Sequence, residues 1–222
     1  MIHILVVAVH PDDETLGCGG TLLKHKKNGD VISWLIVTNV SSERGYAQEL
    51  VDRRQAEIKI VSEMYQFDNV VKLDYSPAKL DEVPFFELVN AFSDKINTLK
   101  PDVIILPNRS DVHSDHKYSF DAVYSCTKNF RYPFISKILM CETLSETEFS
   151  PALNENAFLP NVFNDVTEFM EKKIEIMSVY ESEVMPDNLP RSLSAIRALA
   201  IYRGSRIGVN YAEAFMLLFE KN

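Results

Sequence analysis

Five short apolar segments alternate with segments of helical spacing, and this alternation restricts what the 222-residue chain can fold into. The apolar segments are residues 4–8, 31–37, 70–73, 103–106 and 137–141. Some are rich in β-branched residues and two are nearly unbroken, which is typical of strands buried on both faces. Helical spacing is found at residues 16–27, 48–64, 85–99 and 115–127. The pattern predicts an α/β fold with a parallel sheet and right-handed crossovers.

The length favours one domain over residues 1–222, because single domains commonly have about 100 to 250 residues. Residues 143–165 are polar and irregular and contain Pro151 and Pro160. They are interpreted as a long loop beside the active site rather than as a linker, and residues 166–180 as a helix that follows it.

Charge and cysteine content exclude several classes of protein. The formal net charge of -9 would repel a phosphate backbone, so nucleic acid is not an expected partner. The three cysteines are widely spaced and form no CxxC pair, which argues against a disulfide framework or a thiolate zinc site and favours the cytoplasm. No segment offers the roughly 20 apolar residues of a membrane span. Oligomerisation is left open.

The first segment with side chains suited to metal binding or acid–base chemistry is HPDDE, residues 10–14, directly after the first predicted strand. Ligands of open α/β sheets bind at the carboxyl ends of the strands. His10 and Asp13 could face one divalent ion, since nitrogen and oxygen ligands suit catalytic zinc. Asp12 should point elsewhere and stay free to accept a proton from water. The alternative is that Asp12 or Asp13 only caps the following helix.

The glycines of residues 17–20 (GCGG) could instead suggest a phosphate-binding turn. A GxGxxG motif would need glycine where Leu22 stands, and no acidic residue ends the second strand at Thr38 and Asn39 to hold a ribose. The glycines are therefore expected to permit close packing of a helix against the sheet.

A third metal ligand is expected from the histidines, since catalytic zinc usually has three protein ligands. His3 starts a strand and His25 lies among lysines, so structural or solvated roles are favoured for both. His113 and His116 follow the strand that ends at residue 106 and should reach the same sheet edge as HPDDE. Alone, HxxH could merely begin a helix; together the two motifs predict a site.

These motifs resemble the PIG-L/LmbE-like zinc N-deacetylases. The resemblance rests on HPDDE with residues 16–21 (LGCGGT), on Arg54 with Glu57, on residues 113–116 (HSDH) and on residues 211–215 (YAEAF). It implies a Rossmann-like three-layer fold with a mostly parallel sheet and the active site at the carboxyl edge of the strands. One difference follows the second strand, where relatives often carry Thr-Asp-Gly and this chain has TNVSS at residues 38–42.

The resemblance also implies roles for single residues. Zn²⁺, or another divalent ion such as Fe²⁺, would be held by His10, Asp13 and His116. Asp12 would be the general base, and His113 would steady the tetrahedral intermediate. A protonated His113, held by Asp115, could stabilise the oxyanion or protonate the leaving amine.

Glu14 and Arg54 each have two alternative roles. Glu14 would brace a metal ligand or face solvent as a first-turn helix acid. Arg54 resembles the family's substrate-side arginine, with an ion pair to Glu57 as the alternative. Residues 41–48, Arg54 and residues 143–165 are predicted to build the substrate pocket.

The function implied is removal of the N-acetyl group from an N-acetylglucosamine-type sugar conjugate, free, nucleotide-linked or lipid-linked and related to surface polysaccharide. The partner would be this small molecule. Deacetylation of a low-molecular-weight thiol precursor is the main alternative, since such enzymes share the same core. A Rossmann-type nucleotide-binding enzyme and a catalytically silent sugar-binding module are further alternatives.

Overall fold

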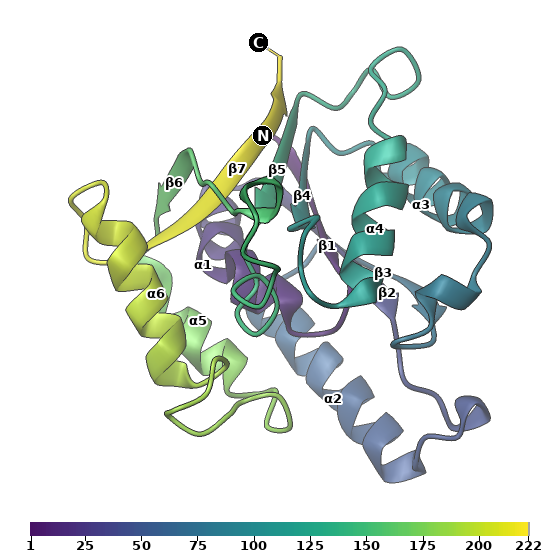
Figure 1. Cartoon of the computed structure of the whole chain (residues 1–222), viewed down its shortest axis with the longest axis horizontal. Helices are drawn as coiled ribbons and strands as arrows, with labels where there is room; N and C mark the ends of the chain where they lie inside the picture. Colours follow the sequence, from purple (N-terminus) through teal and green to yellow (C-terminus); the bar gives the residue numbers. More distant parts are fainter. Residues whose placement is uncertain (222) are drawn as a thin grey trace.

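The computed structural model describes residues 1–221 and contains a seven-stranded sheet (Figure 1). In the sheet the strands follow the order β3-β2-β1-β4-β5-β7-β6. Their bounds are β1 His3–Ala8, β2 Val31–Thr38, β3 Asn69–Tyr75, β4 Val103–Pro107, β5 Lys137–Cys141, β6 Val162–Asp165 and β7 Ala212–Glu220. Strands β1 to β5 pair in parallel, while β7 runs antiparallel to both β5 and β6. The predicted mostly parallel α/β sheet is confirmed.

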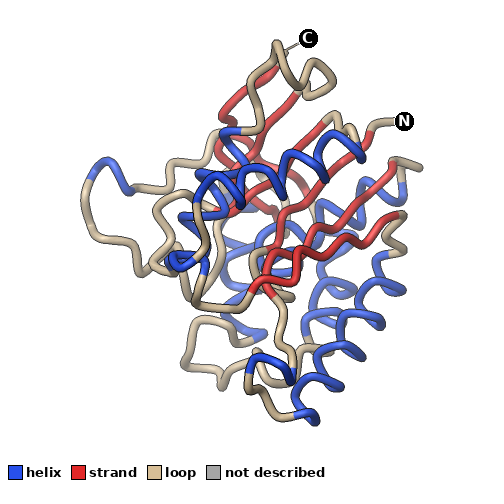
Figure 2. Tube along the Cα trace, turned by 90° about the vertical axis from the view of Figure 1, so that its right-hand side faces the viewer, coloured by secondary structure: helices blue, strands red, loops and turns tan. Residues whose placement is uncertain are grey.

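Helices cover both faces of this sheet (Figure 2). Their bounds are α1 Asp13–Lys27, α2 Gln48–Tyr65, α3 Phe85–Leu99, α4 Ser114–Ser125, α5 Met170–Met177 and α6 Leu193–Ser205. Four short 3₁₀ helices are η1 Ser42–Arg44, η2 Leu80–Glu82, η3 Asn154–Asn156 and η4 Thr167–Phe169. Helices α1, α2, α5 and α6 share one hydrophobic core, and α3 and α4 share the other. The three-layer arrangement implied by the resemblance is therefore present.

Strand β1 shows why the sheet needs helices on both sides. Its residues alternate between the two cores, with Ile4 and Val6 in one and Leu5 and Val7 in the other, and all four are buried. Side chains of a strand point to opposite faces in turn, so a strand that is apolar throughout must be covered twice.

The C-terminal third differs most from the sequence predictions. The interpretation of residues 143–165 as a loop is wrong at its end, where β6 forms. The helix expected over residues 166–180 is shorter: η4 precedes α5, which ends at Met177. Helix α6 and strand β7 were not predicted. Strand β6 has four partly buried or exposed residues and is formed by pairing with β7, so it has little local signal.

Helix α1 begins at Asp13, three residues earlier than predicted, and breaks at Cys18, whose φ of −152° is not helical. The glycines around this break allow close contacts. A Cβ at Gly17 would lie 2.7 Å from Cys141 Sγ, and one at Gly20 would lie 2.7 Å from Val166 Cβ. The close helix packing predicted for these glycines is therefore observed, and the space a phosphate would need is filled.

The break also frees backbone N–H groups inside α1. A carboxylate that is distant in sequence accepts hydrogen bonds from them. The N–H groups of Gly20 and Thr21 donate to the two oxygens of Glu213, at 2.8 and 2.7 Å. Lys173 pairs with the same carboxylate at 2.7 Å and donates to the carbonyl of Leu16 at 3.1 Å. Glu213 thus caps the second half of α1 from β7.

Within residues 1–221, no helix has both the length and the apolar character needed to cross a membrane. Cys18, Cys126 and Cys141 are buried free thiols.

Candidate metal and substrate site

The two sequence motifs meet where the strand order reverses between β1 and β4. These strands are neighbours in the sheet, and residues 10–13 follow β1 while residues 113–116 follow β4. Open α/β sheets bind ligands in the crevice at such a point, because the connections leave the two strands in opposite directions.

One ligand atom each from His10, Asp13 and His116 lies within 4.8 Å of the other two. Asp13 Oδ2 is 3.4 Å from His116 Nε2 and 3.7 Å from His10 Nδ1. Ligands about 2.0 to 2.1 Å from a tetrahedral zinc ion are separated by roughly 3.4 Å. The three side chains are therefore spaced to hold a divalent cation of this size.

His116 carries the clearest sign that a cation belongs here. It is fully buried, and among the described residues its Nε2 has no hydrogen-bond partner. Its Nδ1 lies 2.8 Å from Asp111 Oδ2, which orients the ring with Nε2 toward Asp13. Burial alone would lower the pKa of His116, but the charges of Asp13 and Asp111 raise it well above its usual value. The surroundings thus strongly favour a positive charge.

A second trio, His10, His113 and Asp115, is also close enough to hold an ion. Its members are engaged otherwise. The Asp115 carboxylate accepts from the backbone N–H groups of Ala78 and Leu80, at 2.6 and 3.2 Å, and lies 3.4 Å from His10 Nε2. The trio that includes Asp13 and His116 is therefore the better candidate.

The expected arrangement of His113 and Asp115 needs correction. The Asp115 carboxylate faces His10, and it is the backbone N–H of Asp115 that donates to His113 Nδ1, at 3.1 Å. Burial and the neighbouring His10 lower the pKa of His113. The lowered pKa favours the neutral imidazole, and a neutral ring whose Nδ1 accepts a hydrogen bond carries its proton on Nε2.

Asp12 is held in an unusual conformation. Its φ of 139° is rare for a residue with a side chain and costs about 1 to 3 kcal/mol. Its carboxylate lines the cavity and, within residues 1–221, accepts no hydrogen bond from another side chain. Burial, followed by the charge of Asp13, raises its pKa well above the usual value.

Glu14 supports this turn from beneath. It is fully buried, where burial raises its pKa to about 7, and it accepts hydrogen bonds from Thr15 Oγ1 at 2.7 Å and Tyr180 Oη at 2.8 Å. The backbone N–H of Asp12 donates to its other oxygen at 3.1 Å. Glu14 therefore braces the backbone of Asp12; among the described residues its carboxylate has no hydrogen bond to His10, Asp13 or His116, and it is buried away from solvent.

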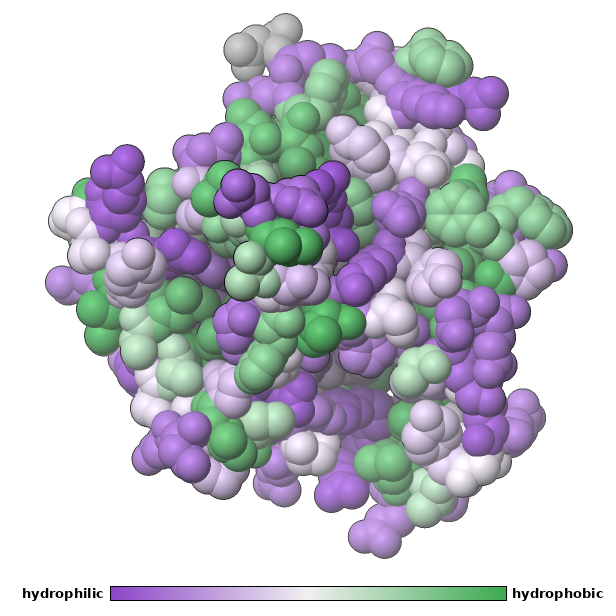
Figure 3. Space-filling view, in the orientation of Figure 1, coloured by the Kyte–Doolittle hydropathy of each residue, from purple (hydrophilic) through white to green (hydrophobic). Residues whose placement is uncertain are grey.

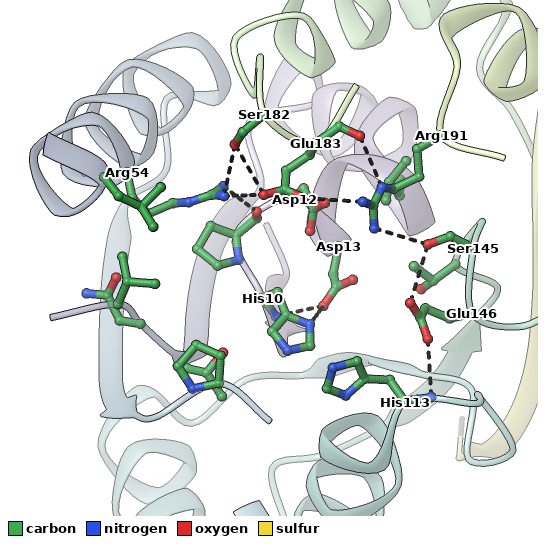
Figure 4. A pocket seen from close by; sticks show the side chains of 18 of the residues that line it. His10, Asp12, Asp13, Arg54, His113, Ser145, Glu146, Ser182, Glu183 and Arg191 are labelled. Carbon is green, nitrogen blue, oxygen red and sulfur yellow. Dashed lines mark hydrogen bonds and ion pairs between the residues drawn. The ribbon is translucent and has the colours of Figure 1, made fainter. Parts of the chain in front are cut away.

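A cavity of about 380 Å³ opens beside these residues (Figure 4). Of the predicted pocket segments, residues 41–48 contribute Tyr46, and residues 143–165 contribute their beginning, at 143–146. The segment between α5 and α6, residues 178–192, was missed although it lines the cavity too. In the orientation of Figure 1, the molecular surface has a hollow below its centre. Hydrophilic side chains lie deep in this hollow (Figure 3).

Arg54 lines the cavity and forms ion pairs as well. It pairs with Glu183 from the missed segment, and its Nη1 lies 3.3 Å from Glu57 Oε2. Nη1 also donates to the carbonyl of Pro11 at 3.2 Å. Arg191 approaches the other oxygen of Glu183, at 3.3 Å. No local motif marks Glu183 or Arg191, because they stand in a polar stretch between two helices.

Two relatives and one crystal structure are similar to this chain over most of its length. A diacetylchitobiose deacetylase of Thermococcus kodakarensis is 24% identical over 218 residues, covering 95% of this chain and 80% of that protein. A "Probable N-acetyl-alpha-D-glucosaminyl L-malate deacetylase 2" of Bacillus anthracis is 23% identical, covering 82% and 81%. The crystal structure of a conserved protein from Thermus thermophilus has the same fold, with a TM-score of 0.79, 24% identity and coverage of 100% and 97%.

A family model matches the part of the chain that contains the motifs meeting at the cavity. The profile of the GlcNAc-PI de-N-acetylases, PIG-L, matches residues 5–127, which is more than half of the chain. The matched range includes both histidine motifs and Arg54. The chain therefore belongs to the PIG-L family.

Proposed function

We propose that this protein is a metal-dependent hydrolase that removes the N-acetyl group from an N-acetylglucosamine-type sugar conjugate. The observation that carries the proposal is the grouping of His10, Asp13 and His116, of which His10 and Asp13 line one cavity together with the free carboxylate of Asp12. Family membership and two relatives named as deacetylases of N-acetylated glucosamine compounds support the same activity.

The donor set supports zinc as the metal. Two imidazole nitrogens and one carboxylate are a common catalytic zinc set, and Fe²⁺ is the alternative. When bound, zinc would make a water molecule more acidic and would polarise the acetyl carbonyl. Asp111 would keep His116 in the ligating tautomer, and Asp115 would orient His10.

The remaining chemistry needs a proton acceptor and a donor to the oxyanion. Asp12 is proposed to take the proton from the attacking water, because its carboxylate reaches the cavity without a competing donor. The carbonyl oxygen then gains negative charge, which the Nε2–H of neutral His113 can stabilise by hydrogen bonding. When the C–N bond breaks, Asp12 can return the proton to the departing amine.

The test is acetate release from N-acetylated sugars by the zinc-loaded protein. Free N-acetylglucosamine, diacetylchitobiose, and nucleotide-linked and lipid-linked conjugates would be compared. We expect at least one to yield equimolar acetate and amine, with loss of activity after chelation and recovery after zinc is restored. Absence of acetate from all of them would overturn the proposal.

Deacetylation of a low-molecular-weight thiol precursor stays the second candidate, and one relative is named as a probable deacetylase of another small conjugate, N-acetyl-alpha-D-glucosaminyl L-malate. N-Acetylglucosaminyl L-malate belongs in the same screen. A cytoplasmic location is also proposed, because three buried free cysteines suit a reducing compartment.

A further inference from the structure

We infer that the cavity selects uncharged N-acetylglucosaminides and discriminates against conjugates with a carboxylate or phosphate close to the N-acetylated ring. This inference rests on the proposed function, and it concerns the substrate class of the same site. It is based on the ion pairs that the cavity's arginines form with glutamates, and on the neutral polar groups of the wall that have no hydrogen-bond partner within residues 1–221.

The described part of the cavity wall contains two cationic side chains, Arg54 and Arg191, and no lysine. Glu183 lies between the two guanidinium groups (Figure 4). One of its carboxylate oxygens meets Arg54 and the other meets Arg191. Arg54 is further balanced by Glu57. An anion on the substrate would thus find both guanidinium groups already neutralised.

The other contacts of these arginines leave them few free donors. Arg54 also donates to the Pro11 carbonyl and to Ser182 Oγ, at 3.2 and 3.4 Å. Arg191 donates to the Glu183 carbonyl and to Ser145 Oγ, at 3.1 and 3.2 Å. To bind an incoming anion they would first have to break bonds that are already charge-assisted.

Carboxylates outnumber cations in the same wall. Four acidic side chains line the cavity, namely Asp12, Asp13, Glu146 and Glu183. With a bound divalent ion, the four carboxylates and the two arginines would have a total formal charge of zero. No positive charge would be left over. The net charge of -9 over the whole chain adds a further repulsion toward anionic ligands.

Neutral polar and apolar groups suit a sugar ring instead. The residues Asn39 and Thr143 line the cavity and are 7% and 1% exposed, and their buried side-chain oxygens Oδ1 and Oγ1 have no hydrogen-bond partner within residues 1–221. Such groups match hydroxyl groups, which can both donate and accept. Tyr46, Leu50 and Pro77 add apolar surface for the C–H face of a pyranose. The wall is therefore complementary to an uncharged, hydroxylated ligand.

The experiment compares two neutral probes with two anionic ones on the zinc-loaded protein. The neutral probes are methyl N-acetyl-β-D-glucosaminide and diacetylchitobiose, and the anionic probes are N-acetylglucosamine 1-phosphate and N-acetylglucosaminyl L-malate. Binding is measured by calorimetry, and kcat/KM by amine release. We expect the neutral probes to be favoured at least about tenfold in both, since an anionic probe would lose its hydration without gaining a free cationic partner.

Glu183→Gln tests the cause. This variant removes the negative charge between the arginines, so a guanidinium group becomes free to pair with an anionic probe. The preference for neutral over anionic probes should then fall about tenfold, as expected for one additional charge-assisted hydrogen bond to the anion. Glu181→Gln is the matched control, because it removes the same charge from an exposed position two residues away and should leave the preference as in the wild type.

The outcomes separate this inference from the proposed function. Anionic probes that bind as tightly as the neutral ones in the wild type would overturn the inference, whether or not Glu183→Gln folds. Neutral probes that bind preferentially but release no acetate would support the inference and overturn the proposed function. If no probe binds, both are overturned.

Discussion

At the scale of single residues, orientation rather than proximity distinguishes the side chains at the strand ends. His116 and His113 belong to one HxxH motif, yet one ring is fixed by the Asp111 carboxylate and the other by a backbone N–H. Within residues 1–221, the buried Nε2 of His116 has no hydrogen-bond partner, whereas His113 lines the cavity with its Nδ1 already accepting a hydrogen bond. The same residue type thus acquires two different chemistries from its hydrogen-bond partner.

Asp111→Asn is expected to weaken metal binding by about 10- to 100-fold, because the carboxylate orients His116 and increases its basicity. Competition with a chromophoric chelator would measure the affinity. Asp121→Asn, an exposed carboxylate of α4, should retain wild-type affinity. Equal affinity in both variants would show that Asp111 does not support the ligand.

Asp12→Asn is expected to retain metal content and fold but to lose about 10²- to 10⁴-fold in kcat, because an amide cannot accept the proton. The substitution is isosteric, so the strained backbone should be unaffected. Elemental analysis and steady-state kinetics on the same preparation would check both points. A kcat close to that of the wild type would move the base to another residue, with His113 the first to examine.

At the scale of elements, α1 shows how a broken helix can serve a site at its start. The break at Cys18 lets the segment before it follow the HPDDE turn while the segment after it packs against the sheet. Glycines keep this packing close, since side chains at Gly17 or Gly20 would collide with Cys141 or Val166.

Gly20→Ala should therefore destabilise the protein by about 1 to 3 kcal/mol through overpacking against Val166, whose side-chain atoms would lie 2.7 to 3.2 Å from the new Cβ. Urea unfolding would measure the change. Val166→Ala makes room for the methyl group, so the double variant should lose less stability than the two single variants summed. Strict additivity would show that the collision is relieved elsewhere.

At the scale of the whole molecule, the C-terminal strand ties the fold to its first helix. Strand β7 pairs with β5 and β6, and from it Glu213 reaches the break in α1, where Lys173 of α5 joins it. Both charged side chains are almost completely buried. One buried ion pair between α5 and β7, with its hydrogen bonds to the backbone of α1, thus joins these three elements.

Glu213→Ala is expected to cost about 3 to 5 kcal/mol of folding free energy, because it leaves a buried ammonium group without its partner. Glu220→Ala on the same strand removes a more exposed ion pair with Lys137 and should cost no more than about 1 kcal/mol. Chemical denaturation of both variants would compare them. Equal losses would mean that the Glu213 pair contributes no more than a surface contact.

The sequence alone was sufficient for the elements that have a strong local pattern. Strands β1 to β5 and helix α3 lie where apolar spacing predicted them, and both histidine motifs could be recognised from residues close together in the chain. Periodicity and motif spacing depend on neighbours within a few positions, so these features are readable without the fold. The roles assigned to His10, Asp12, Asp13 and His116 stay predictions.

Tertiary structure decided the rest, because the deciding contacts join residues far apart in sequence. Arg54 meets Glu183 across 129 positions, and Gly20 meets Glu213 across 193. Pairing with β7 turns four residues of an expected loop into β6, and the Asp115 carboxylate turns to His10 rather than His113. Such contacts are set by how helices and strands pack, and no local pattern of residues encodes them.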